Sequence, residues 1–523
     1  MKIYAYSSIL TCLIALPGIG SIILAMLPSG RIRLIRGSAL ALFTGMLVIT
    51  VVAACLLNWK VVGSDPGLQQ LQQDLIWIPS LNIHYQVCAD PLSMIFMLAI
   101  CILAILACIA SYSVDQRAKI YYILLALLSG SFLGAVASED LFVFYLFLTL
   151  AIFPAYGLVG LWGGSRREPA AMKMALFAMV GSMSMLTACI ILSWASCGIS
   201  HYPDGTLDII ALTHEVPLRQ LWGATPGLHI AGLVFWLMLV GIAIRLGIPS
   251  MHMWLPDVIA ESSAPTGMLI IGGNVLVSGY ALLRILCPIM SEQSHQVRLF
   301  LILLGSFGSL YAALCGLAQS DLRRMISYWL ICMSGIMLTG SALMDMNGIS
   351  GILLLILACP VVFSSFLWMS HIIEKRAYHH DINRLGGLAQ VMPDLLGFSS
   401  FGLLSAIGLP GLCLFAGEFL VLSGIFDAAI SQNNVQAHWL IICGIVLLAA
   451  LVLTTAYLLW AAERIFFGHI QPEYHHFQKL SVMEKAIFLP LIILAVALGL
   501  FMVALVLAPV QPILLDMVTL FGK

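Results

Sequence analysis

The sequence predicts an all-α integral membrane protein with about fourteen transmembrane helices. Of its 523 residues, 61% are hydrophobic and only 9% are charged, whereas about a quarter of the residues in a soluble domain are charged. The apolar residues also gather in runs of about 20, the length that a helix needs to cross a bilayer. A net charge of −1 leaves no basic surface for nucleic acid. Soluble enzymes and DNA-binding proteins are therefore excluded.

Each predicted span is an apolar run bounded by polar or charged residues. The first run follows Lys2 without a small-residue cleavage site, so we expect a membrane helix there and not a removed signal peptide. In chain order, the predicted spans are 6–27, 38–58, 92–111, 119–138, 141–162, 172–196, 227–246, 266–287, 297–318, 325–342, 349–370, 394–426, 437–462 and 484–508.

Two of these spans contain or meet helix-breaking residues. The run 227–246 leads into Gly247 and Pro249, and the run 394–426 contains Gly408-Leu409-Pro410-Gly411. Interrupted helices inside a membrane are typical of transporters built from two related halves. We therefore expect both helices to be discontinuous, at positions that correspond in two repeats.

The basic residues predict the orientation. Sixteen of the 23 Lys and Arg residues lie in loops that follow odd-numbered spans, six lie on the other side, and Arg245 lies inside the seventh run. Because basic loops stay in the cytoplasm, both termini are predicted to lie outside. Even the longest polar loops, 59–91 and 197–226, are too short to form a separate soluble domain, so residues 1–523 are predicted to form a single polytopic membrane domain.

No metal or cofactor site is predicted. Most of the 13 cysteines lie in apolar runs without any CxxC pair, and the 13 histidines form only two adjacent pairs, in polar loops. Neither an Fe–S motif nor one for NADH, flavin or quinone is visible, so redox chemistry is not expected of this chain.

Ionisable residues at membrane depth are the candidate functional residues, because a charge in the bilayer is costly. Glu418 follows the Gly-Pro interruption, and we interpret it as part of an ion path in preference to a structural hydrogen-bonding residue. Arg245 ends its apolar run and fits either an ion path or a side chain that extends to the membrane surface. If both lie near the midplane, each is a possible counter-ion of the other through intervening groups.

The segment between the seventh and eighth spans supplies a third candidate. His252 lies there in His-Met-Trp-Leu-Pro-Asp, and its ordinary pKa near neutrality suits a proton relay, although a lone histidine is more often a hydrogen-bonded structural residue. The acidic residues Asp90, Glu139-Asp140 and Asp321 flank helices and are expected to be solvated ends or helix-terminal partners.

Several motifs, in order, resemble the antiporter-like membrane subunits of respiratory complex I. That family also includes subunits of Mrp-type cation/proton antiporters and membrane-bound hydrogenases, and the similarity is greatest to the type called chain M or subunit 4. The resemblance covers residues 120–470 and rests on Asp140-Leu141-Phe142-Val143-Phe144-Tyr145, His252-Met253-Trp254-Leu255-Pro256-Asp257, Gly279-Tyr280-Ala281-Leu282-Leu283-Arg284, Asp321-Leu322-Arg323-Arg324 and Gly408-Leu409-Pro410-Gly411 with Gly417-Glu418-Phe419.

The resemblance implies fourteen helices in two inverted five-helix repeats, about 119–250 and 297–430, with helices 7 and 12 broken. It also implies a proton path at mid-membrane and other membrane subunits as partners. The expected location is the cell inner (cytoplasmic) membrane.

The implied proton path is incomplete in this sequence. The helix-5 Glu of the family falls at Thr149, the helix-7 Lys at Arg245, the helix-8 Lys at Leu276 and the helix-11 His at Cys359. Only Glu418, in helix 12, is retained. Thr and Leu do not titrate, and Arg stays protonated where a desolvated Lys releases its proton.

Two interpretations of function follow, with a third that differs in the partner. The chain is either a proton- or cation-conducting subunit that uses Glu418, Arg245 and His252 with water, or a transport-deficient structural or coupling subunit. In the third, the chain is the membrane partner of an inorganic-carbon uptake or hydrogenase complex. In each case it is at most a non-redox subunit of an oxidoreductase-type translocase.

Overall fold

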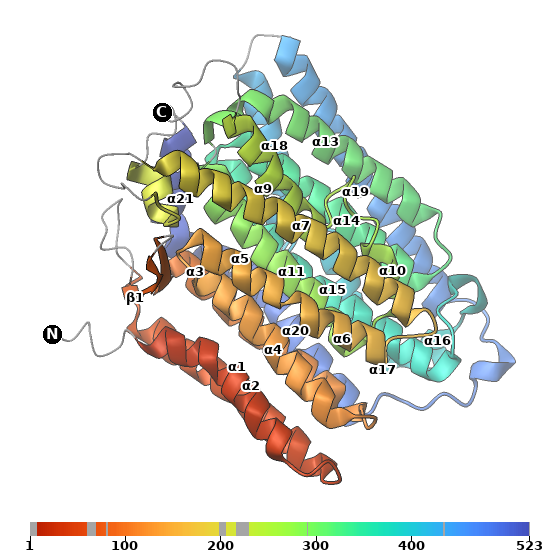
Figure 1. Cartoon of the computed structure of the whole chain (residues 1–523). Helices are drawn as coiled ribbons and strands as arrows, with labels where there is room; N and C mark the ends of the chain where they lie inside the picture. The colour runs from red at the N-terminus through yellow and green to blue at the C-terminus, as the bar shows by residue number, and fades with distance from the viewer. Residues whose placement is uncertain are drawn as a thin grey trace.

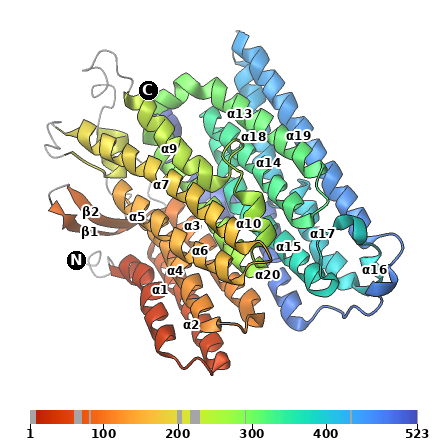
Figure 2. The same ribbon diagram turned by 45° about the vertical axis from the view of Figure 1, so that its right-hand side comes forward.

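The helices of the protein run side by side as one bundle (Figures 1 and 2). The computed structural model describes residues 8–59, 70–79, 82–197, 205–215, 230–289, 291–431 and 435–521. In this part of the chain, twelve helices are long and apolar enough to cross a membrane. The predicted class of helical membrane protein is therefore confirmed.

The N-terminal helices form one edge of the bundle, where α1 and α2 lie beside α4 (Figure 1). The span 141–162 bends at Ala151, which ends α5 and begins α6. The helices of this part are α1 (Ser8–Met26), α2 (Ile32–Leu56), α3 (Pro91–Ala110), α4 (Ala118–Ala137), α5 (Leu141–Leu150), α6 (Ile152–Trp162) and α7 (Arg167–Ser196), with a short 3-10 turn η3 (Ser111–Ser113).

A β-hairpin lies at one end of the bundle, which we call the hairpin end (Figure 2). Strands β1 (Gln70–Ile78) and β2 (Ile83–Ala89) pair antiparallel. The prediction of a purely helical fold with a polar loop over 59–91 was wrong here. β2 buries Val87 and Ala89 completely, so this segment is a strand packed on the helix ends and not a solvated loop.

The centre of the chain supplies the buried helices. The most apolar stretches of α14 and α15 are 94% and 100% buried inside the protein, so these helices contact other helices on all sides. The elements here are η4 (Ala211–Glu215), α9 (Ile230–Leu246), α10 (Leu255–Glu261), α11 (Ala264–Ala281), η5 (Leu282–Leu286), α12 (Cys287–Ile289), α13 (Ser291–Leu317), α14 (Leu322–Leu343) and α15 (Met346–Ala377).

The C-terminal part contains the predicted span 394–426, which forms two helices separated by residues 407–414. Gly408 and Gly411 have positive φ angles of 78° and 93° there, a conformation that favours glycine. The elements are η6 (Ile382–Arg384), α16 (Leu388–Val391), α17 (Pro393–Ala406), α18 (Phe415–Ile430), α19 (Val435–Phe466), η7 (Pro472–Tyr474), α20 (Val482–Leu500), η8 (Val503–Leu507) and α21 (Ala508–Phe521).

Three of the acidic residues that flank helices are N-caps, as predicted. Asp90, Asp140 and Asp321 each accept hydrogen bonds from backbone N–H groups of the helix that follows, α3, α5 and α14 respectively. Such caps satisfy donors that a helix start leaves free. They fix where these three helices begin.

Candidate functional site

Arg245 lies near the end of α9 and is only 4% exposed. Its Nη2 donates to the carbonyl oxygen of Leu148 at 2.7 Å and to Oγ of Ser182 at 3.0 Å. A close approach of α7 and α9 brings Ser182 to this position, since a Cβ atom on Gly241 would lie 2.8 Å from the carbonyl oxygen of Gly181. Arg245 is thus held inside the protein and does not extend to the membrane surface.

A small cavity of about 20 Å³ borders Arg245. Asn274 of α11 contributes the other polar side chain of its lining, and its Oδ1 is buried without a hydrogen-bond partner. The hydroxyl of Thr149, next to Leu148 in α5, is also buried without a partner. Polar groups that lack protein partners at this depth are positions where ordered water or another small ligand binds.

Glu418 lies in the first turn of α18 and is 6% exposed. A Cβ atom on Gly408 would lie 2.5 Å from its Oε2, so the glycine-rich interruption packs directly on the carboxyl group. Its Oε1 is buried without a hydrogen-bond partner. A buried carboxyl group with a free acceptor, beside interrupted helical backbone, is well suited to exchange a proton with water.

Two of the substituted positions have different surroundings. Cys359 of α15 is fully buried and lies within electrostatic reach of Glu418 and Cys413. Leu276 of α11 lines an apolar cavity of about 290 Å³ together with residues of α3, α15 and α20. The environment of Leu276 therefore offers no polar partner for a proton.

His252 lies between α9 and α10 and is largely buried. Its Nδ1 has no hydrogen-bond partner among the described residues, and its ring lies near those of Tyr311 and Tyr328, with centroids 5.7 Å and 6.5 Å away. Nearby, Oγ of Ser334 donates to the carbonyl oxygen of Gly247 at 2.9 Å, which ties α14 to the end of α9. A neutral imidazole with a free nitrogen is able to accept a proton here.

The three candidates do not form one cluster. Among the described residues, neither Arg245 nor Glu418 forms an ion pair, and no hydrogen bond joins His252 to either of them. Within the described part of the chain, Arg245 and Glu418 therefore do not neutralise each other through a direct ion pair. The candidates are separate positions along the bundle.

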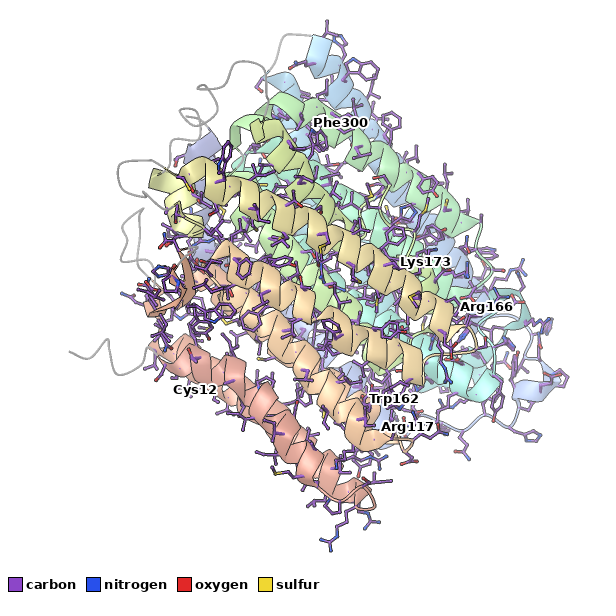
Figure 3. The ribbon with its side chains drawn as sticks, in the orientation of Figure 1. Cys12, Arg117, Trp162, Arg166, Lys173 and Phe300 are labelled. Carbon is purple, nitrogen blue, oxygen red and sulfur yellow. The ribbon has the colours of Figure 1, made fainter. Side chains whose placement is uncertain are left out.

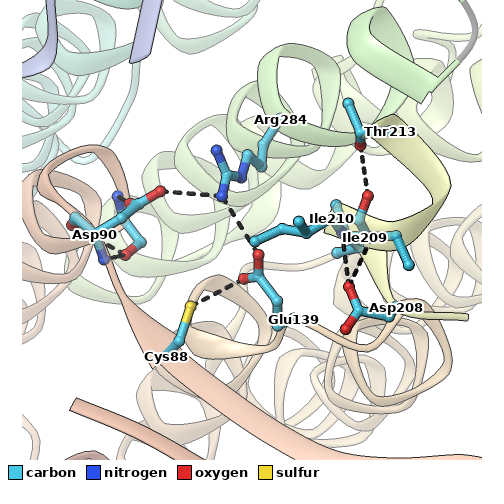
Figure 4. A network of polar contacts seen from close by, with 10 residues as sticks. Cys88, Asp90, Glu139, Asp208, Ile209, Ile210, Thr213 and Arg284 are labelled. Carbon is cyan, nitrogen blue, oxygen red and sulfur yellow. Dashed lines mark hydrogen bonds and ion pairs between the residues drawn. The ribbon is translucent and has the colours of Figure 1, made fainter. Parts of the chain in front are cut away.

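An ion-pair network at the hairpin end was missed by the sequence analysis (Figure 4). Nη2 of Arg284 lies 3.2 Å from Oδ2 of Asp90 and 3.3 Å from Oε1 of Glu139. The thiol of Cys88 donates to Oε2 of Glu139 at 3.0 Å. Asp90 and Glu139 had been interpreted as helix-terminal residues, which is right for Asp90 as a cap, but Glu139 is a buried ion-pair partner. The buried arginine at the end of an apolar run was the signal that could have indicated the network.

Burial changes the acid–base behaviour of the two acidic residues that precede α5. It raises the pKa of Asp140 to about 6, against the effect of hydrogen bonds that Asp140 accepts from backbone N–H groups. It also raises the pKa of Glu139, while the positive charge of Arg284 acts in the opposite direction. The hairpin end therefore carries carboxyl groups whose protonation changes nearer to neutral pH than usual.

Further ion pairs lie at the end of the bundle opposite the hairpin, where Figure 3 labels Lys173 and Arg166 near the start of α7. Asp257 of α10 pairs with Lys173 at 2.7 Å and with Arg324 of α14 at 3.3 Å. Arg323 donates to the carbonyl oxygens of Ala260 and Ser262 and pairs with Glu374 of α15. These contacts fix α10 against α7 and α14.

Comparison with known proteins identifies the family. A family model described as NADH:quinone oxidoreductase/Mrp antiporter, transmembrane, matches residues 138–447, which is more than half of the chain. The chain belongs to this family. It is therefore a multi-pass, antiporter-like membrane protein of the NADH:quinone oxidoreductase/Mrp type.

Relatives within the family cover most of this chain. It is similar to the NADH-quinone oxidoreductase subunit M of Rickettsia conorii, with 30% identity over 87% of each protein. It is also similar to NAD(P)H-quinone oxidoreductase chain 4 3 of Picosynechococcus sp., with 29% identity over 88% of this chain and 79% of that protein. The resemblance to the chain M or subunit 4 type is confirmed.

Solved structures share the fold of this family member. Respiratory complex I from Thermus thermophilus contains a chain that matches with a TM-score of 0.81 and 23% identity, over 98% of this chain and 100% of that one. The Mrp complex from Dietzia sp. DQ12-45-1b contains a chain that matches with a TM-score of 0.79 and 17% identity, over 99% and 97%. The helical architecture is thus common to the complex I and Mrp branches.

Proposed function

We propose that the chain is a proton-conducting membrane subunit of a complex-I-like assembly. The observation that carries the proposal is Glu418, a buried carboxyl group with an unpartnered oxygen beside an interrupted helix. Retaining a desolvated carboxyl group in hydrocarbon is costly, so its presence favours a function in ion movement. Family membership supports the same function.

The proposed transmembrane arrangement has fourteen spans in two inverted repeats, about 119–250 and 297–430. Twelve of the proposed spans are the long apolar helices. The other two are broken spans, one made of α9 and α10 and the other of α17 and α18. A paired motif supports the repeats. Asp140, the N-cap of α5, forms an isolated antiparallel β-bridge with Asp208, and Asp321, the N-cap of α14, forms one with Asp381. In each bridge, the residues that flank the two aspartates form two backbone hydrogen bonds.

The second of these bridges has the same pattern as the first. The N–H groups of Leu141 and Ile209 donate to Leu207 and Glu139, and those of Leu322 and Ile382 donate to His380 and Ser320. The first bridge lies beside β2 at the hairpin end, and the second lies next to η6 at the opposite end (Figure 2). Equal motifs at opposite ends are what an inverted repeat produces.

In the proposed path, Glu418 and His252 are the groups that take up and release protons. Arg245 stays charged and therefore acts as a fixed positive charge that orients water. The buried hydroxyl groups of Thr149 in α5 and Ser278 in α11, which have no hydrogen-bond partner among the described residues, provide positions for such water. The path replaces the missing titratable groups by hydrogen-bonded water.

A second candidate is a transport-deficient coupling subunit, which the surroundings of Leu276 favour. This residue lines an apolar cavity with no polar side chain, and water binds poorly where it finds no hydrogen-bond partner. A dry segment at this position would interrupt a water-filled path. The subunit would then keep the transporter fold and serve assembly.

For the cellular setting we propose the cell inner (cytoplasmic) membrane, with both termini outside and other membrane subunits as partners. The excess of Lys and Arg on one set of loops supports this orientation. Mass spectrometry of co-purifying proteins would identify the partner. NADH-oxidising subunits would support a complex I assembly, and hydrogenase subunits or a soluble zinc protein would indicate the other assemblies.

The test is proton flux in liposomes. The chain is purified with its partners, reconstituted, and assayed with a pH-sensitive dye under an imposed potential. We expect Glu418→Gln to abolish flux, because the amide has nearly the size of the carboxyl group but does not titrate. The matched control is Glu473→Gln, since Glu473 is exposed in η7.

Three results are distinguishable. Flux that is lost in Glu418→Gln and retained in Glu473→Gln supports the proposed path. Flux that both variants retain contradicts a role for Glu418. Absence of flux in the unmodified protein, with partners still bound, supports the transport-deficient candidate.

A further inference from the structure

The buried arginines of this protein differ in how their charge is compensated. Arg284, Arg323 and Arg376 each have a carboxylate oxygen between 2.7 and 3.3 Å away. Arg245 is as deeply buried, yet no carboxylate of the described residues forms an ion pair with it. Its partners are a carbonyl oxygen and the hydroxyl of Ser182, which are neutral.

An uncompensated cation is costly in an apolar interior. A carbonyl and a hydroxyl group solvate part of the charge, but they do not neutralise it. Arginine also has five N–H donors, and both hydrogen bonds of Arg245 come from Nη2. The donors of Nε and Nη1 remain free for a ligand.

The cavity beside Arg245 has the size for a small ligand. Its volume of about 20 Å³ exceeds the space that one water-sized species needs. Arg245 and Asn274 are its polar lining side chains, and the rest of the lining is apolar or aromatic: Leu128, Phe132, Ala151, Ile152, Ala155, Met174, Ala178, Ile244 and Trp254. A ligand here meets one full positive charge and one amide.

The amide of Asn274 fits an anion as well as water. Its Oδ1 has no donor partner in the protein, and rotation by 180° about the last side-chain bond would present its NH₂ group in the same place. Water finds hydrogen-bond partners in Arg245 and Asn274, but it leaves the positive charge of the guanidinium group uncompensated. A monovalent anion instead gains the direct attraction of the guanidinium group, which is strong in a low dielectric.

We propose that the cavity beside Arg245 binds one small monovalent inorganic anion of the halide class. The anion neutralises Arg245 among α4, α6, α7, α9 and α11, whose residues line the cavity, and so holds these helices together. The volume excludes larger organic anions. This inference concerns charge compensation, and it holds whether or not the chain conducts protons.

The first test is thermal unfolding of the purified complex in chloride and in gluconate at equal ionic strength. Because a ligand that binds only the folded state stabilises it by mass action, we expect saturable stabilisation by chloride and bromide and none by gluconate. Arg245→Gln should lose this response. An equal halide response in Arg245→Gln and in the unmodified protein would place the anion elsewhere and overturn the proposal.

A matched pair of variants at Ser182 gives a stricter test. Ser182→Asp places a carboxylate next to the guanidinium group that Ser182 already contacts, so the protein supplies its own counter-ion. We expect its halide response to disappear. Ser182→Asn introduces an uncharged side chain of nearly the size of aspartate and should keep the halide response. A response that is lost in Ser182→Asn and kept in Ser182→Asp would contradict the proposal.

Direct observation covers the case in which these variants do not fold. A crystal of the unmodified protein grown in bromide should show an anomalous peak within hydrogen-bonding distance of Arg245 and Asn274. Density without an anomalous signal at this position would mean water, and the proposal would be wrong.

Discussion

Replacing Arg284 by methionine should strongly destabilise the hairpin end of the bundle. Methionine has a similar length and packs well in apolar surroundings, so the change mainly removes the charge. The substitution leaves Asp90 and Glu139 without their shared partner. Their side chains are 4% and 3% exposed, so water cannot replace it.

The size of the effect follows from this burial. Removing one partner of a buried ion pair costs about 3–5 kcal/mol, because an uncompensated charge stays behind. Here one arginine serves two carboxylates, so we expect a value toward the upper end of that range. The exposed Arg384, whose side chain is 72% exposed beside Asp381, is the control, and Arg384→Met should change stability by less than about 1 kcal/mol.

The loss should also depend on pH. Burial raises the pKa of Glu139, and Arg284 opposes this rise, so the pKa rises further in Arg284→Met. A carboxyl group whose folded-state pKa lies above its unfolded value lowers stability as pH rises through that folded-state pKa. The variant should therefore be less impaired at pH 5 than at pH 8, and Glu139→Gln in addition should restore part of the stability.

The assay is thermal unfolding of the detergent-purified protein, followed by the intrinsic fluorescence of its 11 tryptophans, which can be recorded at both pH values. Each variant is compared with the unmodified protein at pH 5 and pH 8. Unfolding of Arg284→Met at the same temperature as Arg384→Met would refute the reasoning. So would a loss that is independent of pH, since it would show that the carboxyl groups are not the cause.

Three further outcomes follow from other contacts. Gly408→Ala places a Cβ atom on a residue with a φ of +78° and against Oε2 of Glu418. The substitution should lower the free energy of unfolding by at least about 1–2 kcal/mol and reduce proton flux. Normal flux would contradict this packing. Burial raises the pKa of Asp140 to about 6, so the unfolding free energy of the unmodified protein should fall by up to about 3 kcal/mol as the pH rises from 4 to 8. Asp140→Asn keeps the cap but does not titrate, so its unfolding free energy should fall by less. Parallel pH profiles of the two proteins would contradict this prediction. Arg323→Met removes two hydrogen bonds to carbonyl oxygens and the pair with Glu374. Because the Glu374 side chain is 36% exposed, water can solvate it, and chemical denaturation should show a loss in unfolding free energy of only about 1–3 kcal/mol; no measurable loss would show that these contacts contribute little.

Features that depend on neighbouring residues were predicted well from the sequence. Runs of apolar residues gave the membrane class, because each helix satisfies its own backbone hydrogen bonds. Asp90, Asp140 and Asp321 were recognised at helix ends, because a cap bonds within a few residues of itself. Gly408 was recognised in a helix-breaking run for the same local reason.

The hairpin was not predicted, although it is close in sequence. Strand β2 (Ile-His-Tyr-Gln-Val-Cys-Ala) lacks a regular alternation of polar and apolar residues, and its burial depends on the helix ends that cover it. A two-stranded hairpin is only marginally stable alone, so its own residues give a weak signal. The bundle decides that this segment forms strands.

The sequence by itself determined the class of the protein, the positions of its apolar helices and the ionisable residues that lie within them. Only the tertiary structure decided the partners of those residues. Arg284 and Glu139 are 145 positions apart. Within the described residues, Arg245 bonds to Ser182 and pairs with no carboxylate, and Glu418 packs on Gly408 and pairs with no cation. Hydropathy is a property of each segment, whereas the compensation of a buried charge depends on which distant segments pack against it.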